Sequence, residues 1–98
     1  MPSKAARTKL SMVRGRIDRM DLQLLRLVNQ RAALALLIGR IKKRRRWPVF
    51  DAEREAFVLR HVMRANRGPL SAGAVRRIFH AVLRECRRRE RAVSKQSS

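Results

Sequence analysis

The sequence contains few of the residues that bind metals, form disulfides or stack against nucleic-acid bases. Among its 98 residues are one cysteine, one tryptophan, no tyrosine and two histidines. A single cysteine excludes an intramolecular disulfide, and two isolated histidines do not make a metal site, so no metal is expected. The longest apolar run, Ala32 to Ile38, is far shorter than the roughly 20 residues that cross a bilayer. We therefore expect a soluble, cytoplasmic protein.

Acidic residues are scarce as well, which leaves a large positive charge. Seven Asp and Glu stand against 26 Lys and Arg, giving a net charge of +19. Such an excess indicates an anionic partner, which is nucleic acid, an acidic membrane or a small polyanion, and the charge alone does not choose among them. The length allows about one domain of the usual roughly 100–200 residues. A hydrophobic content of 45% is enough for a packed core.

Apolar residues in the first half of the chain alternate at spacings of three and four, which is the seam pattern of a coiled-coil-like helix. The pattern predicts one helix from about Leu10 to Lys43. At about 50 Å, this helix would overhang a compact monomer with a radius of gyration of about 13 Å, so we expect a homodimer that shares it. The seam positions are Leu10, Val13, Ile17, Met20, Leu24, Leu27, Arg31, Leu34, Ile38 and Ile41.

Two shorter helices are expected to follow, because proline and capping residues divide the rest of the sequence. Pro48 cannot continue a helix, and Asp51 is a typical N-cap for a second one. The segment from Asn66 to Pro69 ends this helix, with Gly68 in the left-handed position directly after it. Ser71 is the expected N-cap of the third helix.

The predicted organisation is therefore an all-α chain of three helices, one long and two shorter. Residues 10–93 form the helical domain, with short flexible tails at residues 1–9 and 94–98. The apolar stripes of the two shorter helices are Ala52, Ala56, Leu59, Val62 and Met63, and Val75, Ile78, Phe79, Val82 and Cys86.

Two basic residues lie where they could bind an anion. Arg31 interrupts the apolar seam. It is either a polar residue that sets the helix register, or a residue whose stem packs while its charged end reaches water, or an anion-binding arginine. Lys42 lies about 20° away around the helix and roughly three turns further on, so both side chains share one face. Alternatively, Lys42 begins the solvated basic run of residues 42–46.

Acidic residues mark the two shorter helices. Glu90 follows Cys86 by four residues and occupies a position where the stripe of the third helix calls for an apolar side chain. From the residues alone, an ion pair of Glu90 with Arg87 or Arg91 at the helix end is the simpler interpretation. Asp51, Arg54 and Glu55 share one face of the second helix, and a cap together with a surface ion pair explains them equally well.

A set of spaced residues runs through almost the whole chain, from about Leu10 to Val93. It comprises Arg14, Ile17-Asp18, Asp21, Leu24-Leu25, Arg31, Ile38-Gly39-Arg40-Ile41-Lys42, Pro48 to Glu55 and Asn66 to Leu70. Together these residues resemble the all-helical chorismate mutases. The resemblance implies an intertwined homodimer of three-helix protomers that converts chorismate to prephenate in aromatic amino-acid biosynthesis. This Claisen rearrangement is unimolecular and uses no cofactor.

The resemblance also implies how the dianionic substrate is bound. Arg31 and the partner subunit's Arg14 would hold its two carboxylates, with Arg54 supporting the carboxylate end. Lys42 would donate to the ether oxygen, which becomes more negative in the transition state.

Four further positions complete the implied site. The backbone of Asp51 and the carboxylate of Glu55 would hold the ring hydroxyl. Cys86 and Glu90 stand where the best-known family pattern has Ser and Gln. Cys86 is a weaker donor than Ser, and Glu90 must be protonated to donate to the ether oxygen, so activity is expected to fall as pH rises.

Two other functions fit parts of the sequence. Isochorismate pyruvate lyases resemble this fold, although Pro48 to Glu55 and Asn66 to Leu70 look more like the mutase. A nucleic-acid-binding helical dimer fits the charge, but Arg31 lies on the seam and aromatic residues for base stacking are few. Nucleic acid is therefore expected to bind only nonspecifically, at low salt. The sequence leaves open whether another shikimate-pathway enzyme is a partner.

Overall fold

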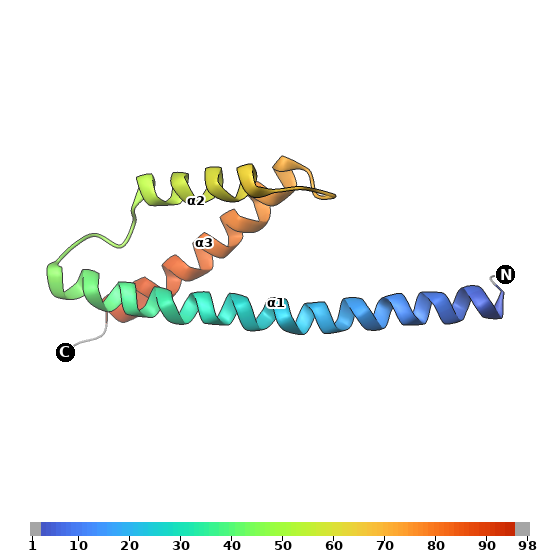
Figure 1. Ribbon diagram of the computed structural model, residues 1–98. Coiled ribbons are helices and arrows are strands. Elements are labelled where there is room, and N and C mark those ends of the chain that lie inside the picture. The colour runs from blue at the N-terminus through green and yellow to red at the C-terminus, as the bar shows by residue number, and fades with distance from the viewer. Residues whose placement is uncertain (1–2, 96–98) are drawn as a thin grey trace. The chain divides into compact units, whose positions relative to one another are not determined.

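The fold is all-helical over residues 3–95, which are the residues that the computed structural model describes. It consists of α1 (Lys4–Arg45), α2 (Ala52–Ala65) and α3 (Ala72–Ser94) (Figure 1). The predicted architecture of one long N-terminal helix and two shorter helices is confirmed. None of the helices in the described part of the chain is long and apolar enough to span a membrane.

The chain divides into two units, which we call the N-terminal unit (residues 1–30) and the C-terminal unit (residues 31–98). The N-terminal unit contains the first part of α1. The C-terminal unit contains the last turns of α1 together with α2 and α3. In this unit α3 turns back along α2 after the connecting loop (Figure 1).

The beginning of α1 differs from the prediction. The helix begins at Lys4 and not near Leu10, because Ser3 caps it: the Ser3 hydroxyl accepts from the backbone N–H of Ala6 at 3.1 Å. Apolar periodicity cannot detect these first turns, since they carry mostly polar residues. At the other end α3 includes Ser94, and Lys95 is its C-cap. The remaining residues of the predicted C-terminal tail, 96–98, lie outside the described residues, as do residues 1–2.

The end of α1 has the hydrogen bonds of a Schellman motif. The backbone N–H of Trp47 donates to the carbonyl of Lys42 at 2.9 Å, and that of Arg46 donates to Lys43 at 3.2 Å. Arg46 occupies the left-handed region at φ 58°, a conformation that usually favours glycine. The chain therefore leaves the helix before Pro48.

Both predicted caps of the shorter helices are confirmed. The Asp51 carboxylate accepts from the backbone N–H of Arg54 at 3.0 Å, and the Ser71 hydroxyl accepts from Ala74 at 3.1 Å. Gly68 has the expected positive φ of 77°, but it is not directly after the helix. The C-cap of α2 is Asn66, whose backbone is already extended and whose side-chain oxygen accepts from the N–H of Gly68 at 2.9 Å.

The core of the C-terminal unit is small and is built from all three helices. Four of its members, Ala35, Val58, Leu83 and Val93, were not in the predicted seam or stripes, whereas Ile78, which was, is 48% exposed. The buried apolar residues are Ala35, Val58, Val75, Leu83, Cys86 and Val93.

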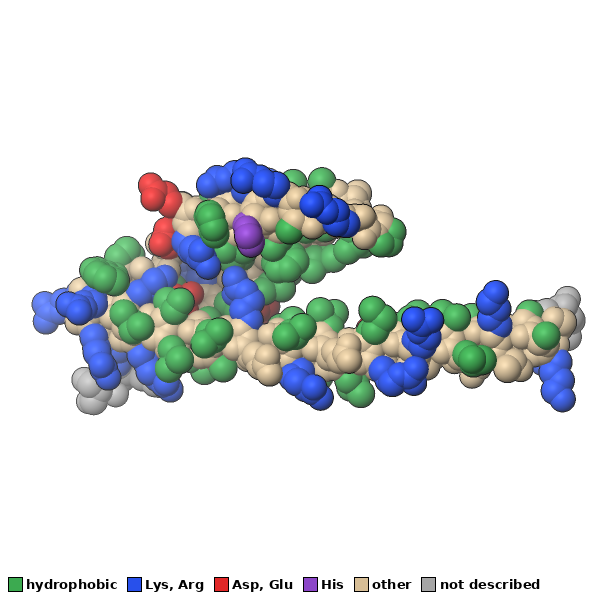
Figure 2. Space-filling model, in the orientation of Figure 1, with side chains coloured by type: hydrophobic (Ala, Val, Ile, Leu, Met, Phe, Trp, Pro, Cys, Tyr) green, Lys and Arg blue, Asp and Glu red, His purple; other side chains and the backbone are tan. Residues whose placement is uncertain are grey.

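The apolar seam of α1 remains exposed in the single chain. Its nine apolar positions are each between 45% and 64% exposed. Figure 2 shows hydrophobic side chains on the visible face of α1. Such an apolar stripe is typical of a surface that is covered in an assembly.

Candidate active site

A cavity of about 350 Å³ lies in the C-terminal unit, a size typical of sites for small ligands. Its wall combines apolar side chains with three basic and three acidic ones. The lining residues are Arg31, Leu34, Ala35, Ile38, Lys42, Val49, Asp51, Arg54, Glu55, Val58, Leu83, Cys86 and Glu90.

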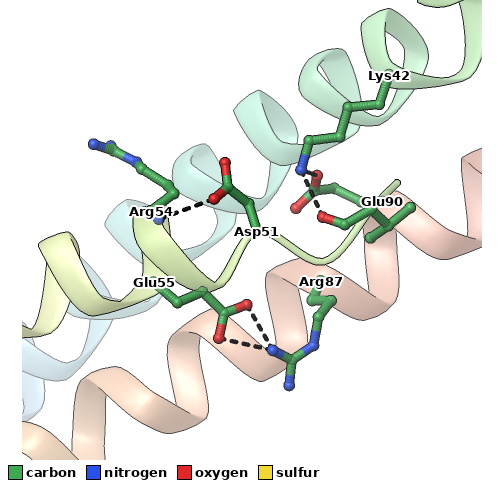
Figure 3. Close-up of polar contacts among 7 residues, drawn as sticks. Lys42, Asp51, Arg54, Glu55, Arg87 and Glu90 are labelled. Carbon is green, nitrogen blue, oxygen red and sulfur yellow. Dashed lines mark hydrogen bonds and ion pairs between the residues drawn. The ribbon is translucent and has the colours of Figure 1, made fainter. Parts of the chain in front are cut away.

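The side chain of Lys42 is held at this cavity by two contacts. Its ammonium donates to the backbone carbonyl of Val49 at 2.6 Å and to Oε1 of Glu90 at 2.8 Å (Figure 3). The side chains of Lys42 and Glu90 are only 16% and 13% exposed. An ammonium has three N–H donors, so these two contacts leave one donor for a ligand in the cavity.

Gly39 allows α1 and α3 to come close enough for this contact. A Cβ atom at position 39 would lie 3.0 Å from Cα and 3.1 Å from the carbonyl oxygen of Glu90. Both atoms belong to the backbone of α3, so a larger side chain would force the two helices apart. Lys42 lies one turn after Gly39 on α1, so Gly39 supports the pairing of Lys42 with Glu90.

A second ion pair joins α2 to α3 beside the cavity. Nη1 of Arg87 donates to both carboxylate oxygens of Glu55, at 2.7 and 2.6 Å (Figure 3). The guanidinium of Arg87 also lies over the ring of Phe50, 5.2 Å from its centroid. Sequence reasoning missed this role of Arg87, because the pair joins residues far apart in the chain.

The other basic residues of the cavity differ in their surroundings. The Arg54 guanidinium lies over the ring of Phe57, 5.1 Å from its centroid. Arg31 is half-buried and makes no hydrogen bond or ion pair with the residues that the structure describes. Its five N–H donors are therefore available to an anionic ligand.

Seven of the eight site residues predicted from the sequence line this one cavity. The exception is Arg14, which is exposed and lies in the N-terminal unit. Cys86 is buried, at 4% exposure, at the wall of the cavity. In the described part of the chain, no group of three or more His, Cys, Asp or Glu side chains is placed to hold a metal.

Comparison with known proteins identifies the family. Residues 13–91, most of the chain, match the family Chorismate mutase type II. The chain belongs to this family. The match includes Arg14 and every residue that lines the cavity.

Curated relatives of this chorismate mutase type II chain are longer proteins. It is 39% identical over 87 residues to a bifunctional chorismate mutase/prephenate dehydratase of Pseudomonas aeruginosa, and 41% identical over 81 residues to that of Neisseria gonorrhoeae. These alignments cover 84% and 83% of this chain but 24% and 22% of the relatives. The chain thus spans about a quarter of the length of the curated relatives it matches.

Solved structures of similar length have the same fold. Chorismate mutase from Thermus thermophilus in its form II superimposes with a TM-score of 0.84 at 26% identity, covering 92% of this chain and 99% of that one. Form I superimposes with a TM-score of 0.78 at 27% identity, covering 80% and 98%.

Proposed function

We propose that this chain converts chorismate to prephenate as a homodimer with two active sites. The observation that carries the proposal is the placement of Lys42: its ammonium is fixed at the wall of a small cavity that Arg31 and Arg54 also line. A unimolecular rearrangement of a dianion needs cations at fixed positions, and it needs no nucleophile or cofactor.

The substrate's two carboxylates are bound by Arg31 and by the partner subunit's Arg14. Arginine suits this role because its planar guanidinium matches the geometry of a carboxylate. Binding both carboxylates selects the compact conformer in which the reacting carbons are close together. Arg54 supports the carboxylate end, and the buried thiol of Cys86 contributes a weak donor.

The ether oxygen gains negative charge as its bond to the ring breaks. The remaining N–H donor of Lys42 points at this oxygen and stabilises the developing charge. The two existing contacts of the ammonium, with Val49 and Glu90, fix its position before the substrate arrives.

Glu90 has two roles that depend on its protonation. As a carboxylate it accepts the hydrogen bond from Lys42, and as a carboxylic acid it donates to the ether oxygen. An ionised Glu90 facing that oxygen would oppose the developing charge.

The ring hydroxyl is bound at the start of α2. The backbone of Asp51 and the carboxylate of Glu55 both lie at the cavity wall there. Each Glu55 oxygen accepts one contact from Arg87 and retains a lone pair for the substrate.

Two observations support the homodimer. The apolar seam of α1 is exposed in the single chain and offers a continuous surface for a second copy. Arg14 is exposed in the N-terminal unit, and the cavity wall of one chain carries as many acidic as basic side chains. A dianion requires more positive charge than that, and the partner subunit's Arg14 supplies it.

The test is the disappearance of chorismate, with prephenate identified as the product, for the wild type and Arg31→Ala at moderate salt. Arg40→Ala is the matched control, because Arg40 is exposed on α1 and is not among the residues described as lining the cavity. We expect turnover by the wild type and the control, and a large loss in Arg31→Ala with helicity and dimer unchanged. Pyruvate released from isochorismate without any prephenate from chorismate would instead assign the lyase.

A further inference from the structure

We propose that Arg87 is a positioning residue for this reaction, which orients the carboxylate of Glu55 and compensates its charge so that a dianion can enter the cavity. The inference rests on the proposed function. It adds a residue that does not itself touch the substrate: Glu55 lines the cavity, whereas Arg87 is not among the described residues of the wall.

The geometry fixes the Glu55 carboxylate from behind. One nitrogen of Arg87 contacts both carboxylate oxygens, at 2.7 and 2.6 Å. Phe50, beside the guanidinium, limits the other positions that Arg87 can take. Three segments therefore meet at this point: α2 through Glu55, α3 through Arg87, and the loop before α2 through Phe50.

The pair is sheltered from water, so its charges are weakly screened. The side chains of Arg87 and Glu55 are 18% and 20% exposed. Arg88, the next residue of α3, forms an ion pair with Glu85 at 3.1 Å. The side chains of this pair are 64% and 56% exposed. Exposed pairs of that kind contribute little, whereas a sheltered carboxylate that loses its partner keeps an uncompensated charge.

That uncompensated charge would face the substrate. The cavity wall carries three basic and three acidic side chains and so has no net charge when all are ionised. Arg87 stands behind one of the three acids and adds a positive charge close to the cavity. Without Arg87, Glu55 would repel the incoming carboxylates, and its oxygens would no longer be held for the ring hydroxyl.

The experiment compares Arg87→Met, Arg87→Lys, Glu55→Gln and the double variant Arg87→Met/Glu55→Gln, with Arg88→Met as the matched control. Steady-state kinetics with chorismate give kcat and KM at low and moderate salt, and thermal unfolding reports on the fold. We expect Arg87→Met to raise KM about tenfold, because the substrate would then meet the uncompensated negative charge of Glu55 in a sheltered site. The increase should shrink with added salt.

The double variant separates positioning from a purely structural role. Removing the charge of Glu55 also removes the repulsion, so KM of the double variant should fall back to that of Glu55→Gln alone. Arg87→Lys keeps the charge and should give an intermediate KM, which keeps the test open if Arg87→Met does not fold. Arg88→Met should match the wild type.

The outcomes distinguish this inference from the proposed function. If the folded wild type does not turn over chorismate, the proposed function fails and the role of Arg87 fails with it. If the wild type is active and folded Arg87 variants keep its KM at both salt concentrations, only the role of Arg87 is overturned. If Arg87→Met raises KM by the same factor in the Glu55→Gln background as in the wild type, the role of Arg87 is also overturned.

Discussion

The ammonium of Lys42 and the carboxylate of Glu90 are 48 residues apart in sequence and 2.8 Å apart in space. This contact joins the last turns of α1 to α3 and holds the cation at the cavity wall. The same contact holds the carboxyl group of Glu90 at the cavity wall. Glu90 is the residue that stands where the best-known family pattern has glutamine. The position of the Lys42 ammonium therefore depends on the carboxyl group of Glu90.

Replacing Lys42 by alanine would remove the donor that we propose for the ether oxygen. We expect kcat to fall by about 10²–10³-fold, the effect of losing one donor to a developing oxyanion. Stopped assays of prephenate formation measure this loss, with Arg40→Ala as the control and circular dichroism as the check on the fold. Retention of wild-type kcat in folded Lys42→Ala would remove Lys42 from the chemistry.

Glu90→Gln tests whether the acid form of Glu90 is active. Glutamine donates through its amide at every pH, whereas Glu90 donates only when it carries a proton. We therefore expect wild-type kcat to fall as pH rises and the profile of Glu90→Gln to be flat. Kinetics from mildly acidic to mildly basic pH, run on both proteins in the same buffers, decide this. Coinciding profiles would show that Glu90 does not control the rate.

Gly39→Ala tests the close approach of α1 and α3. The added Cβ would lie 3.0 Å from Cα of Glu90, so we expect lower stability together with lower activity. Gly15→Ala is a matched control on the same helix, because its Cβ would meet only the Arg19 guanidinium, at 3.8 Å. It should stabilise the helix by about 0.5–1 kcal/mol. Urea unfolding measures the free energy of unfolding of both variants. Equal changes in this free energy for Gly39→Ala and Gly15→Ala would contradict the prediction.

Arg46→Gly tests the end of α1. Arg46 has φ 58°, where a side chain is strained and glycine is not. We expect the variant to be more stable by about 1 kcal/mol. Thermal unfolding, with Arg45→Gly as the helical control that should lose stability, makes the comparison. A destabilised Arg46→Gly would mean that the Arg46 side chain makes a contact worth more than the strain.

The parts of the structure that could be predicted are those that depend on local sequence. The caps at Asp51 and Ser71 follow from short side chains that satisfy free backbone N–H groups, and Pro48 requires an interruption. Arg31 and Glu90 were identified because charged residues on apolar stripes need a partner, and Lys42 because it shares a face of α1 with Arg31. Periodicity shows which face such a residue occupies but not which partner lies opposite.

Other features depend on contacts or on weak local signals. The Arg87–Glu55 pair could not be singled out, because α3 contains several other arginines that could equally be partners of Glu55. The close approach at Gly39 depends on how two helices cross. The start of α1 at Lys4 was missed because a single cap, Ser3, precedes turns with no apolar stripe.

In the proposed dimer, chorismate is rearranged in a cavity that the partner subunit's Arg14 completes. Prephenate formation by Arg14→Ala and Arg31→Ala tests this arrangement, with the two variants assayed separately and after they are unfolded and refolded together. Each variant alone should be inactive, because each of its sites lacks one arginine. A mixed dimer contains one site with both arginines, so co-refolding should restore a substantial fraction of the wild-type turnover. If the co-refolded mixture forms mixed dimers and stays inactive, the shared site is contradicted.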